Sequence, residues 1–256
     1  MRIVVKVGTS TLAHPSGHLN IRHIEKLVKV LSDIKNAGNE VILVSSGAIG
    51  MGMGKLHLRE RPKTLPEKQA AAAVGQCELM YTYDKLFSEY NHITAQILLT
   101  GSDVRDDERR QNFIVTTERL LEYGALPVIN ENDTVATEEI VIGDNDTLAA
   151  IVATHLSADL LVLLSDIDGL YTANPRTDPT ARLIPEVPEL TPEIIASAGG
   201  KGSDIGTGGM QTKLVAARMV MESGGDMIIA NGADPGVLYD ILDGASVGTR
   251  FIGQKK

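Results

Sequence analysis

Lys6 is a charged residue inside an apolar run, in the stretch IVVKVGTST at residues 3–11. The run predicts a buried strand that ends in a turn of small residues. A buried ammonium group without a partner would be strongly destabilising or would lose its proton, so Lys6 should face a carboxylate, a ligand phosphate, or both. The ordinary alternative is a strand-end lysine whose stem packs while its head group reaches water. Taken alone, Lys6 leaves both interpretations open.

A second lysine, Lys213, ends the glycine-rich stretch GTGGMQTK at residues 206–213. A glycine-rich turn that leads into a helix favours phosphate binding, because it combines free N–H groups with the positive end of the helix dipole. Lys213 would lie near the end of the first helical turn, where it could reach a phosphoryl group in transfer. An ordinary helix start would not need three glycines, a threonine and a lysine together, so this stretch favours a phosphate site.

The run SSGAIGMGMG at residues 45–54 places four glycines after another apolar segment. We interpret it as a loop whose backbone approaches a ligand and offers N–H groups to an anion, and the alternative is an ordinary surface loop. The dinucleotide fingerprint does not fit, because the first turn lacks G-x-G-x-x-G and no acidic residue ends the second strand. The P-loop motif does not fit either, because Lys6 precedes its glycine instead of following a glycine-rich loop.

Amide and carboxylate side chains cluster in INENDTVAT at residues 129–137 and in GDNDT at residues 143–147. Such groups at a strand end suit the recognition of an ammonium group or the orientation of lysines. Asn and Asp also cap helices and build turns, and one of Asp144 or Asn145 should do only that. A third polar stretch, SDIDGLY at residues 165–171, offers groups to a sugar or base, and a metal site or a solvated loop are its alternatives.

Apolar segments of strand length must position these residues. They lie at residues 3–7, 41–44, 94–99, 126–129, 160–164 and 227–230. Helical patterns between them predict helices at residues 21–37, from 65 towards 90, after Arg109, at 145–157 and at 210–222. Short strands without clean alternation, separated by helices, predict a mainly parallel sheet covered on both faces, with ligands beyond the carboxyl ends of its strands. The proline-rich residues 171–191 should leave the sheet.

Length and composition limit the function classes. A chain of 256 residues is long enough for one large α/β domain or two small lobes. Its formal net charge of -9 argues against a general nucleic-acid or membrane-surface binder, because phosphate backbones and anionic lipids select basic patches. The single cysteine, Cys77, excludes an internal disulfide framework, and a buried thiol is expected in its alanine-rich run. Without a signal peptide or a long apolar span, the sequence predicts a cytoplasmic protein.

Six stretches of the chain resemble the amino-acid kinase family and follow one another in the family's order. They are VVKVGTS, VSSGAIG, INENDTVAT, GDND, LLSDIDGLYTANPR and GTGGMQTK, spread over residues 4–213. The resemblance implies an open three-layer αβα sandwich around a mainly parallel sheet of about eight strands. It also implies a single domain at residues 1–256, with an acid-substrate lobe at 1–158 and a nucleotide lobe at 159–256. A carboxyl-terminal PUA domain, which many members of the subgroup most similar to this chain carry, would be absent.

The same resemblance implies which residues form the site. Lys6 and Lys213 would be catalytic, and Asp146 would organise their ammonium groups. Contacts to the acid substrate would come from Ser46, Gly47, Asp133 and Asn145. Contacts to the nucleotide would come from Lys6, Gly8, Ser165, Asp166, Thr207, Gly208, Gly209, Met210, Gln211, Thr212 and Lys213. No metal ligand on the protein is assigned.

The implied reaction transfers the γ-phosphoryl group of ATP, in the presence of Mg²⁺, to the γ-carboxylate of L-glutamate, giving L-glutamyl 5-phosphate on the way to proline. The attacking carboxylate is already an anion, so no general base is needed and no His or Cys constellation is expected. Feedback inhibition by proline and a homo-oligomer, dimer or tetramer, are further expectations from the resemblance. Two alternatives are a kinase for another small acid or phosphate, and a non-catalytic amino-acid or nucleotide sensor. Asp133 favours a substrate with a free ammonium group.

Overall fold

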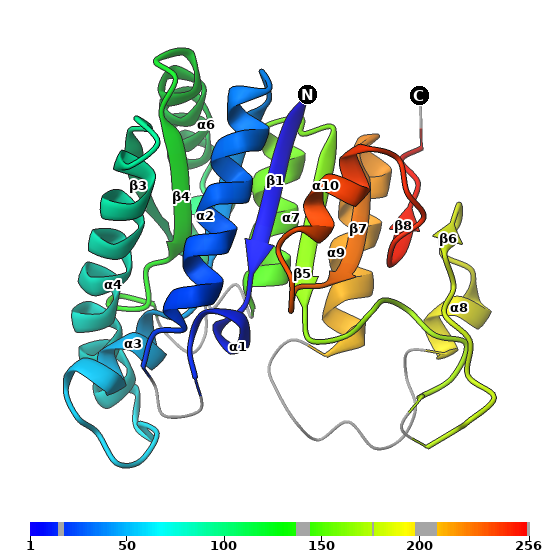
Figure 1. The fold of residues 1–256 in the computed structure, drawn as a ribbon, viewed down its shortest axis with the longest axis horizontal. Helices are drawn as coiled ribbons and strands as arrows, with labels where there is room; N and C mark the ends of the chain where they lie inside the picture. The colour runs from blue at the N-terminus through cyan, green and yellow to red at the C-terminus, as the bar shows by residue number, and fades with distance from the viewer. Residues whose placement is uncertain (15–17, 137–143, 176, 198–208, 255–256) are drawn as a thin grey trace.

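The computed structural model describes residues 1–14, 18–136, 144–175, 177–197 and 209–254, and its strands form one sheet (Figure 1). The strand order is β3-β4-β2-β1-β5-β7-β8-β6, and all paired strands are parallel except β7 and β8. The predicted mainly parallel sheet of eight strands is therefore confirmed. The strands are β1 (Arg2–Val7), β2 (Glu40–Ser45), β3 (Thr94–Leu99), β4 (Leu126–Glu131), β5 (Leu160–Ser165), β6 (Glu186–Val187), β7 (Asp226–Asn231) and β8 (Thr249–Phe251).

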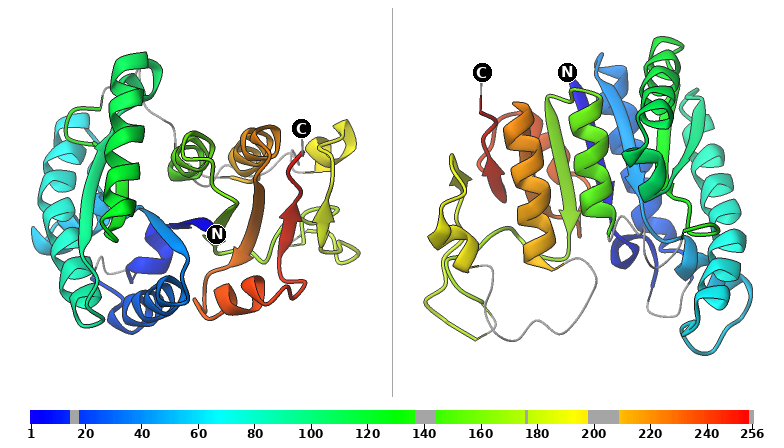
Figure 2. Two further views of the ribbon diagram at one scale, coloured as in Figure 1. Left: turned by 90° about the horizontal axis from the view of Figure 1, so that it is seen from above. Right: turned by 180° about the vertical axis from the view of Figure 1, so that it is seen from behind.

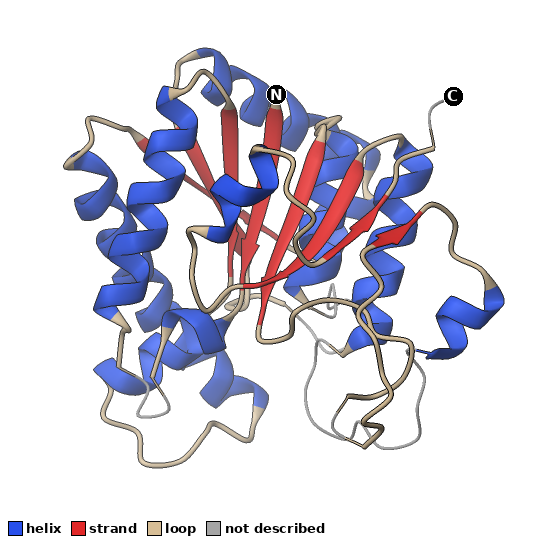
Figure 3. Ribbon diagram, turned by 45° about the vertical axis from the view of Figure 1, so that its right-hand side comes forward, coloured by secondary structure: helices blue, strands red, loops and turns tan. Residues whose placement is uncertain are grey.

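Helices cover both faces of this sheet, so the core consists of two apolar layers (Figure 2, Figure 3). One layer contains α2 (Ile21–Asn36), α4 (Leu65–Ser88) and α10 (Val237–Leu242). The other contains α6 (Asp107–Glu122), α7 (Asn145–His155) and α9 (Met210–Ser223). Four short helices lie in the connections: α1 (Thr9–Leu12), α3 (Ala48–Lys55), α5 (Gly101–Arg105) and α8 (Pro192–Ser197). Of the described helices, none has the length and apolar character needed to cross a membrane.

Strand β1 lies near the centre of the sheet, and its alternation explains the direction of Lys6. Successive side chains of a strand point to opposite faces. Val5 and Val7 pack in the layer of α2, whereas Val4 packs in the layer of α7 and α9. Lys6 shares the face of Val4, and its side chain is therefore directed toward the helices α7 and α9.

Most of the stretch SSGAIGMGMG forms the helix α3, so its interpretation as a loop was wrong. The glycines of α3 and α4 allow the two helix backbones to touch. A Cβ atom on Gly52 would lie 1.8 Å from the carbonyl oxygen of Ala71, and a Cβ atom on Gly75 would lie 1.7 Å from that of Ala48. Any larger residue at either position would force the two helices apart.

Three other expectations differ from the structure. Residues 171–191 do not leave the sheet altogether, because β6 pairs with β8 at its edge. Neither strand was predicted, since each has only two or three residues. Cys77 is exposed, because it lies on the outward side of α4. Helix α6 begins at Asp107, whereas the sequence analysis expected a start after Arg109.

Candidate active site

The carboxyl ends of the parallel strands meet at one edge of the sheet, the lower edge in Figure 1. The chain leaves β1, β2, β4 and β5 at this edge, and the helices α7 and α9 begin there. Their first turns therefore bring side chains distant in the sequence to the end of β1. Ligands of open parallel sheets bind at this edge, so a functional site is expected here.

A cluster of Lys6, Asp146 and Lys213 lies at this edge, between β1, α7 and α9. The Lys6 Nζ atom forms an ion pair with Asp146 Oδ1 at 2.7 Å. The Lys213 Nζ atom donates a hydrogen bond to the other carboxylate oxygen, Asp146 Oδ2, at 2.8 Å. The three side chains are only 13%, 2% and 7% exposed, in the order Lys6, Asp146, Lys213. One buried carboxylate thus bridges two ammonium groups.

The cluster carries a net positive charge. Burial by itself would raise the pKa of Asp146, but the ammonium groups of Lys6 and Lys213 outweigh burial and lower it below its ordinary value. Asp146 is therefore an anion at neutral pH and balances only one of the two cations. The remaining positive charge, held in a place of low exposure, favours an anionic ligand such as a phosphoryl group.

Helix α7 begins with three polar residues that have separate tasks. Asp144 is the N-cap and accepts a hydrogen bond from the backbone N–H of Thr147 at 2.8 Å. Asn145 is not needed for capping, and its side chain turns to the end of β2, where it contacts Ser46. Asp146 turns to the lysines. One of Asp144 and Asn145 was expected to cap the helix, and Asp144 is that cap.

A chain of side-chain amides extends from α7 to α4. The Asn145 Nδ2 atom donates to Ser46 Oγ at 2.7 Å and to Asn130 Oδ1 at 2.9 Å. The Asn130 Nδ2 atom donates to Gln76 Oε1 at 2.9 Å. We call Gln76, Asn130, Asn145 and Ser46 the amide chain. It brings together two predicted substrate residues, Ser46 and Asn145, and adds two that were not predicted.

A pocket of about 400 Å³ lies at the far end of the amide chain, where Gln76 forms part of its wall. Asp133 also lines it and is half-buried. Burial raises the pKa of Asp133 to about 6, and the Glu131 carboxylate adds to this effect. A half-buried carboxylate beside a small pocket suits the ammonium group of a ligand. The other lining residues are Ala48, Ala72, Ala73, Cys77, Met80, Gln96, Leu98, Asn132 and Thr134.

The predicted nucleotide residues of β5 and α9 lie on the opposite side of β1 from the amide chain. They lie at the carboxyl end of β5 and at the amino end of α9. Ser165 is the last residue of β5 and donates from Oγ to Asp166 Oδ1 at 3.3 Å. Gly209 is the N-cap of α9, and a Cβ atom there would meet nothing within 4 Å. Met210, Gln211, Thr212 and Lys213 form the first turn of α9. Thr207 and Gly208 lie outside the described residues.

Two further glycines predicted to contact ligands, Gly8 and Gly47, are the N-cap residues of α1 and α3. Gly47 has a φ angle of +110°, a backbone conformation that favours glycine. Both follow strands that end at the carboxyl edge, so the structure places them at the same edge of the sheet as Lys6.

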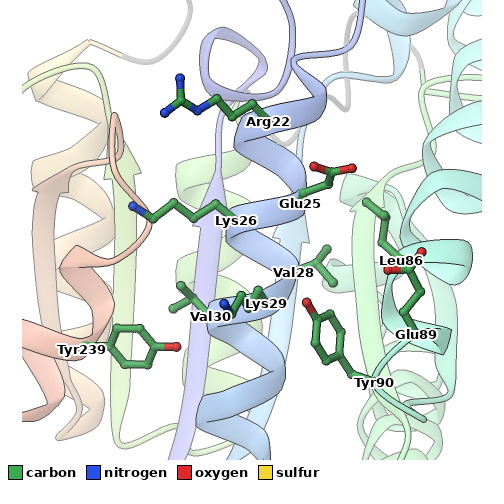
Figure 4. A pocket seen from close by; sticks show the side chains of 10 residues that line it. All are labelled: Arg22, Glu25, Lys26, Val28, Lys29, Val30, Leu86, Glu89, Tyr90 and Tyr239. Atoms are coloured by element: carbon green, nitrogen blue, oxygen red, sulfur yellow. The ribbon is translucent and has the colours of Figure 1, made fainter.

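A hollow of about 590 Å³ lies away from this cluster. It runs along the outer side of α2, with Tyr90 and Tyr239 on its two flanks (Figure 4). Its lining mixes basic and acidic side chains and contains none of the predicted site residues. Within the described residues, no group of three or more His, Cys, Asp or Glu side chains could hold a metal ion.

Gln76 was not predicted, and Asn130 was given no contact of its own. The sequence does contain a signal for Gln76, because it lies four residues after Ala72 and three before Leu79, both inward-facing on α4. A polar residue in an inward apolar stripe needs a partner. Asn130 was only noted as part of a polar cluster, since its partners come from α7 and α4, which the sequence does not place together.

The fold and this site define an α/β enzyme that acts on anionic groups. The chain belongs to the amino acid kinase family, whose model matches residues 1–231. It is 54% identical over 259 residues to a protein named glutamate 5-kinase from Clostridium perfringens, which covers 99% of this chain and 96% of the relative. Glutamate 5-kinases of Listeria innocua and Carboxydothermus hydrogenoformans are 55% and 57% identical to this chain over its whole length. The matched regions make up 94% and 68% of those two relatives.

Solved structures with low sequence identity share the fold. A carbamate kinase from Giardia lamblia bound to AMP-PNP superposes with a TM-score of 0.69 at 17% identity, over 99% of this chain and 98% of that one. An isopentenyl phosphate kinase of T. acidophilum, in a product complex, gives a TM-score of 0.67 at 20% identity, over 98% and 99% of the two chains. The three-layer architecture of this family is thus present over nearly the whole chain.

Proposed function

We propose that this protein transfers the γ-phosphoryl group of ATP to the γ-carboxylate of L-glutamate, giving L-glutamyl 5-phosphate, the first step of proline biosynthesis. The observation that carries the proposal is the buried cluster of Lys6, Asp146 and Lys213, with its net positive charge, which the amide chain connects to a pocket that contains Asp133. The identity of 54% to 57% to proteins named glutamate 5-kinase supports the choice of substrate.

The chemical difficulty of this reaction is repulsion between two anions. The attacking carboxylate needs no general base, so the protein has to neutralise charge and hold the reactants in line. Lys6 and Lys213 would stabilise the charge that develops on the transferring group. Asp146 would hold both ammonium groups in place between turnovers, and its lowered pKa makes it a poor proton acceptor.

The acid substrate would lie between the amide chain and the pocket. Asp133 would pair with the substrate ammonium group, and Ser46, Gly47 and Asn145 would contact its carboxylates. This arrangement is supported by the hydrogen bond that joins Asn145 to Ser46 and by the small pocket beside Gln76. In this proposal the acid-substrate lobe corresponds to residues 1–158.

ATP would bind over residues 159–256, with Ser165 and Asp166 beside the nucleoside and the first turn of α9 at the phosphates. The open space at Gly209 and its place at the positive end of α9 support a phosphate there. Mg²⁺ would be held mainly by the phosphates of ATP. Mg²⁺ would supply further neutralisation of the phosphate charge.

The proposal is tested by incubating the protein with ATP, Mg²⁺ and a panel of acids in the presence of hydroxylamine, which traps an acyl phosphate as a hydroxamate. We expect hydroxamate and ADP with L-glutamate, and neither with N-acetylglutamate, aspartate or carbamate. ADP release without hydroxamate would indicate a different acceptor. Retention of ATP in every reaction would favour the sensor alternative.

Three properties of the family complete the proposal. We infer a homo-oligomer, dimer or tetramer, which light scattering of the purified protein measures. Proline is proposed as a feedback inhibitor, and adding it to the hydroxamate assay tests this directly. We also propose a cytoplasmic location, which fractionation of cells that express the protein would test.

A further inference from the structure

Gln76 is an exception on the inward side of α4. The neighbours that share this side are apolar or aromatic, and Ala72, Leu79, Tyr83 and Phe87 are all buried. An amide in such a stripe loses contact with water and gains no hydrophobic stabilisation. Helix packing alone therefore does not explain a glutamine at this position.

One end of the Gln76 amide is fixed by a hydrogen bond and the other is not. Its Oε1 atom accepts from Asn130 Nδ2 at 2.9 Å. Its Nε2 atom is buried and has no hydrogen-bond partner among the described residues. A buried donor without an acceptor carries a desolvation penalty, so the glutamine is held here at the expense of stability. This is expected of a residue that serves the site.

Asn130 links Gln76 to Asn145, one of the predicted substrate residues. Asn130 accepts from Asn145 with its Oδ1 atom while it donates to Gln76 with its Nδ2 atom. A side-chain amide has one accepting end and one donating end, so these two bonds fix which way the Asn130 amide faces. Asn130 in turn fixes the amide of Asn145, which also contacts Ser46.

We propose that Gln76 is a positioning residue for the acid substrate, acting through Asn130 on the side chain of Asn145. The inference rests on the proposed function, because it assumes that Asn145 and Ser46 contact the substrate. In this proposal Gln76 forms part of the pocket wall and acts on the reacting groups only through Asn130 and Asn145. Its effect should therefore lie in the binding of the acid and leave the nucleotide side unchanged.

The test is Gln76→Met, which keeps the length of the side chain and removes its amide. We expect KM for L-glutamate to rise about tenfold, the effect of losing one buried hydrogen-bond contact. We expect kcat within about twofold of wild type and an unchanged KM for ATP, because the lysine cluster is untouched. The thermal midpoint should stay within a few degrees of wild type, since the variant also removes the buried Nε2 donor.

Two comparisons separate positioning from a general loosening of α4. Leu79→Val removes a methylene from the same stripe of α4 without touching the amide chain, and we expect a lower thermal midpoint with an unchanged KM for glutamate. In the double variant with Asn145→Ala, Gln76→Met should change KM by less than about twofold, because its effect passes through Asn145. Gln76→Leu provides a second apolar variant if the methionine variant does not accumulate.

The inference is overturned by a wild-type KM in a folded Gln76→Met or Gln76→Leu protein, or by a full tenfold effect that persists in the Asn145→Ala background. A raised KM in Leu79→Val equal to that of Gln76→Met would also overturn it. Failure of the proposed function has a different result, in which the wild-type protein gives no hydroxamate with glutamate.

Discussion

Strand β1 carries a low-exposure cation at each end, and the two have different surroundings. Arg2, at the start, donates to both carboxylate oxygens of Glu118, at 2.6 and 2.8 Å, and to Glu40 at 2.8 Å. It also donates to the carbonyl oxygen of Leu156. Two carboxylates thus surround the single positive charge of Arg2. This group of side chains lies at the amino edge of the sheet, and its positive charge is fully balanced by its own carboxylates.

Lys6, near the end of the same strand, shares its one carboxylate with a second cation. Asp146 pairs with both Lys6 and Lys213, so within these three side chains positive charge exceeds negative charge. A charge cluster with a surplus can be completed by a ligand of opposite charge, whereas a cluster with enough partners only joins parts of the fold. The balance of charge therefore separates the candidate active site from the structural cluster at Arg2.

The largest effect is expected for Asp146→Asn, which removes the anion between the two lysines. The ammonium groups would repel one another, so we expect turnover to fall about a thousandfold or more. The free energy of unfolding should fall by about 3 kcal/mol, as when a buried ion pair loses one partner. Hydroxamate assays and urea denaturation measure the two effects.

The pH dependence of Asp146→Asn shows how the residue acts. A residual rate that varies with pH as in the wild type fits a residue that holds the lysines. Loss of a basic limb from the profile would instead assign proton transfer to Asp146 and contradict the role proposed here.

Lys213→Met should separate activity from stability. We expect a rate lower by roughly two to three orders of magnitude, the scale for loss of one preorganised charge donor. Asp146 keeps Lys6 as its partner, so the free energy of unfolding should change by less than about 1 kcal/mol. Near-normal turnover would remove Lys213 from the mechanism.

Arg2→Met should give the opposite result. Glu40 and Glu118 are 46% and 39% exposed and can turn to water when the guanidinium is lost, so we expect a loss of about 1–3 kcal/mol in the free energy of unfolding. The rate and both KM values should remain those of wild type. Lys63→Met is a matched control, because its ion pair with Glu60 is exposed and should contribute no measurable stability. Slow turnover in Arg2→Met would mean that the two clusters are coupled.

The cluster of Lys6, Asp146 and Lys213 could be predicted from the sequence only in part. The apolar run around Lys6 required a partner for its ammonium group, and the glycine-rich turn placed Lys213 in the first turn of a helix. Asp146 as their common partner followed only from the resemblance to a family. Which side chains meet at the carboxyl edge depends on the strand order, with β1 between β2 and β5, and local patterns do not determine that order.

The elements that escaped prediction depend on tertiary contacts. Helix α3 contains three glycines, which have low helix propensity, and it forms because Gly52 and Gly75 let it lie directly against α4. Gln76 was missed for a related reason, since its partner Asn130 comes from β4. Local sequence patterns do not identify the partner in either contact. Cys77 was predicted to be buried because its neighbours in the sequence are mostly alanine. Its exposure depends on its position on the outward side of α4, which composition does not give.

A smaller effect is expected from Asp133, a half-buried carboxylate of the pocket whose pKa is raised to about 6. Below about pH 6 the carboxyl group is protonated and cannot pair with an ammonium group. The KM for glutamate should therefore rise about tenfold for each pH unit below the pKa, while kcat changes little. Initial rates between about pH 5 and pH 8 measure this dependence.

Asp133→Asn should remove this dependence, leaving KM high at every pH. Stability changes in the other direction. Because the folded-state pKa lies above the ordinary value of 3.8, the stabilisation linked to protonation is present below about pH 4 and is lost as the pH rises through about 6. At about pH 8 the wild type carries a buried charge that Asn lacks, so Asp133→Asn should be more stable by about 1 kcal/mol. A variant that is less stable at this pH, or that keeps the wild-type KM, would show that Asp133 is a structural residue like Arg2.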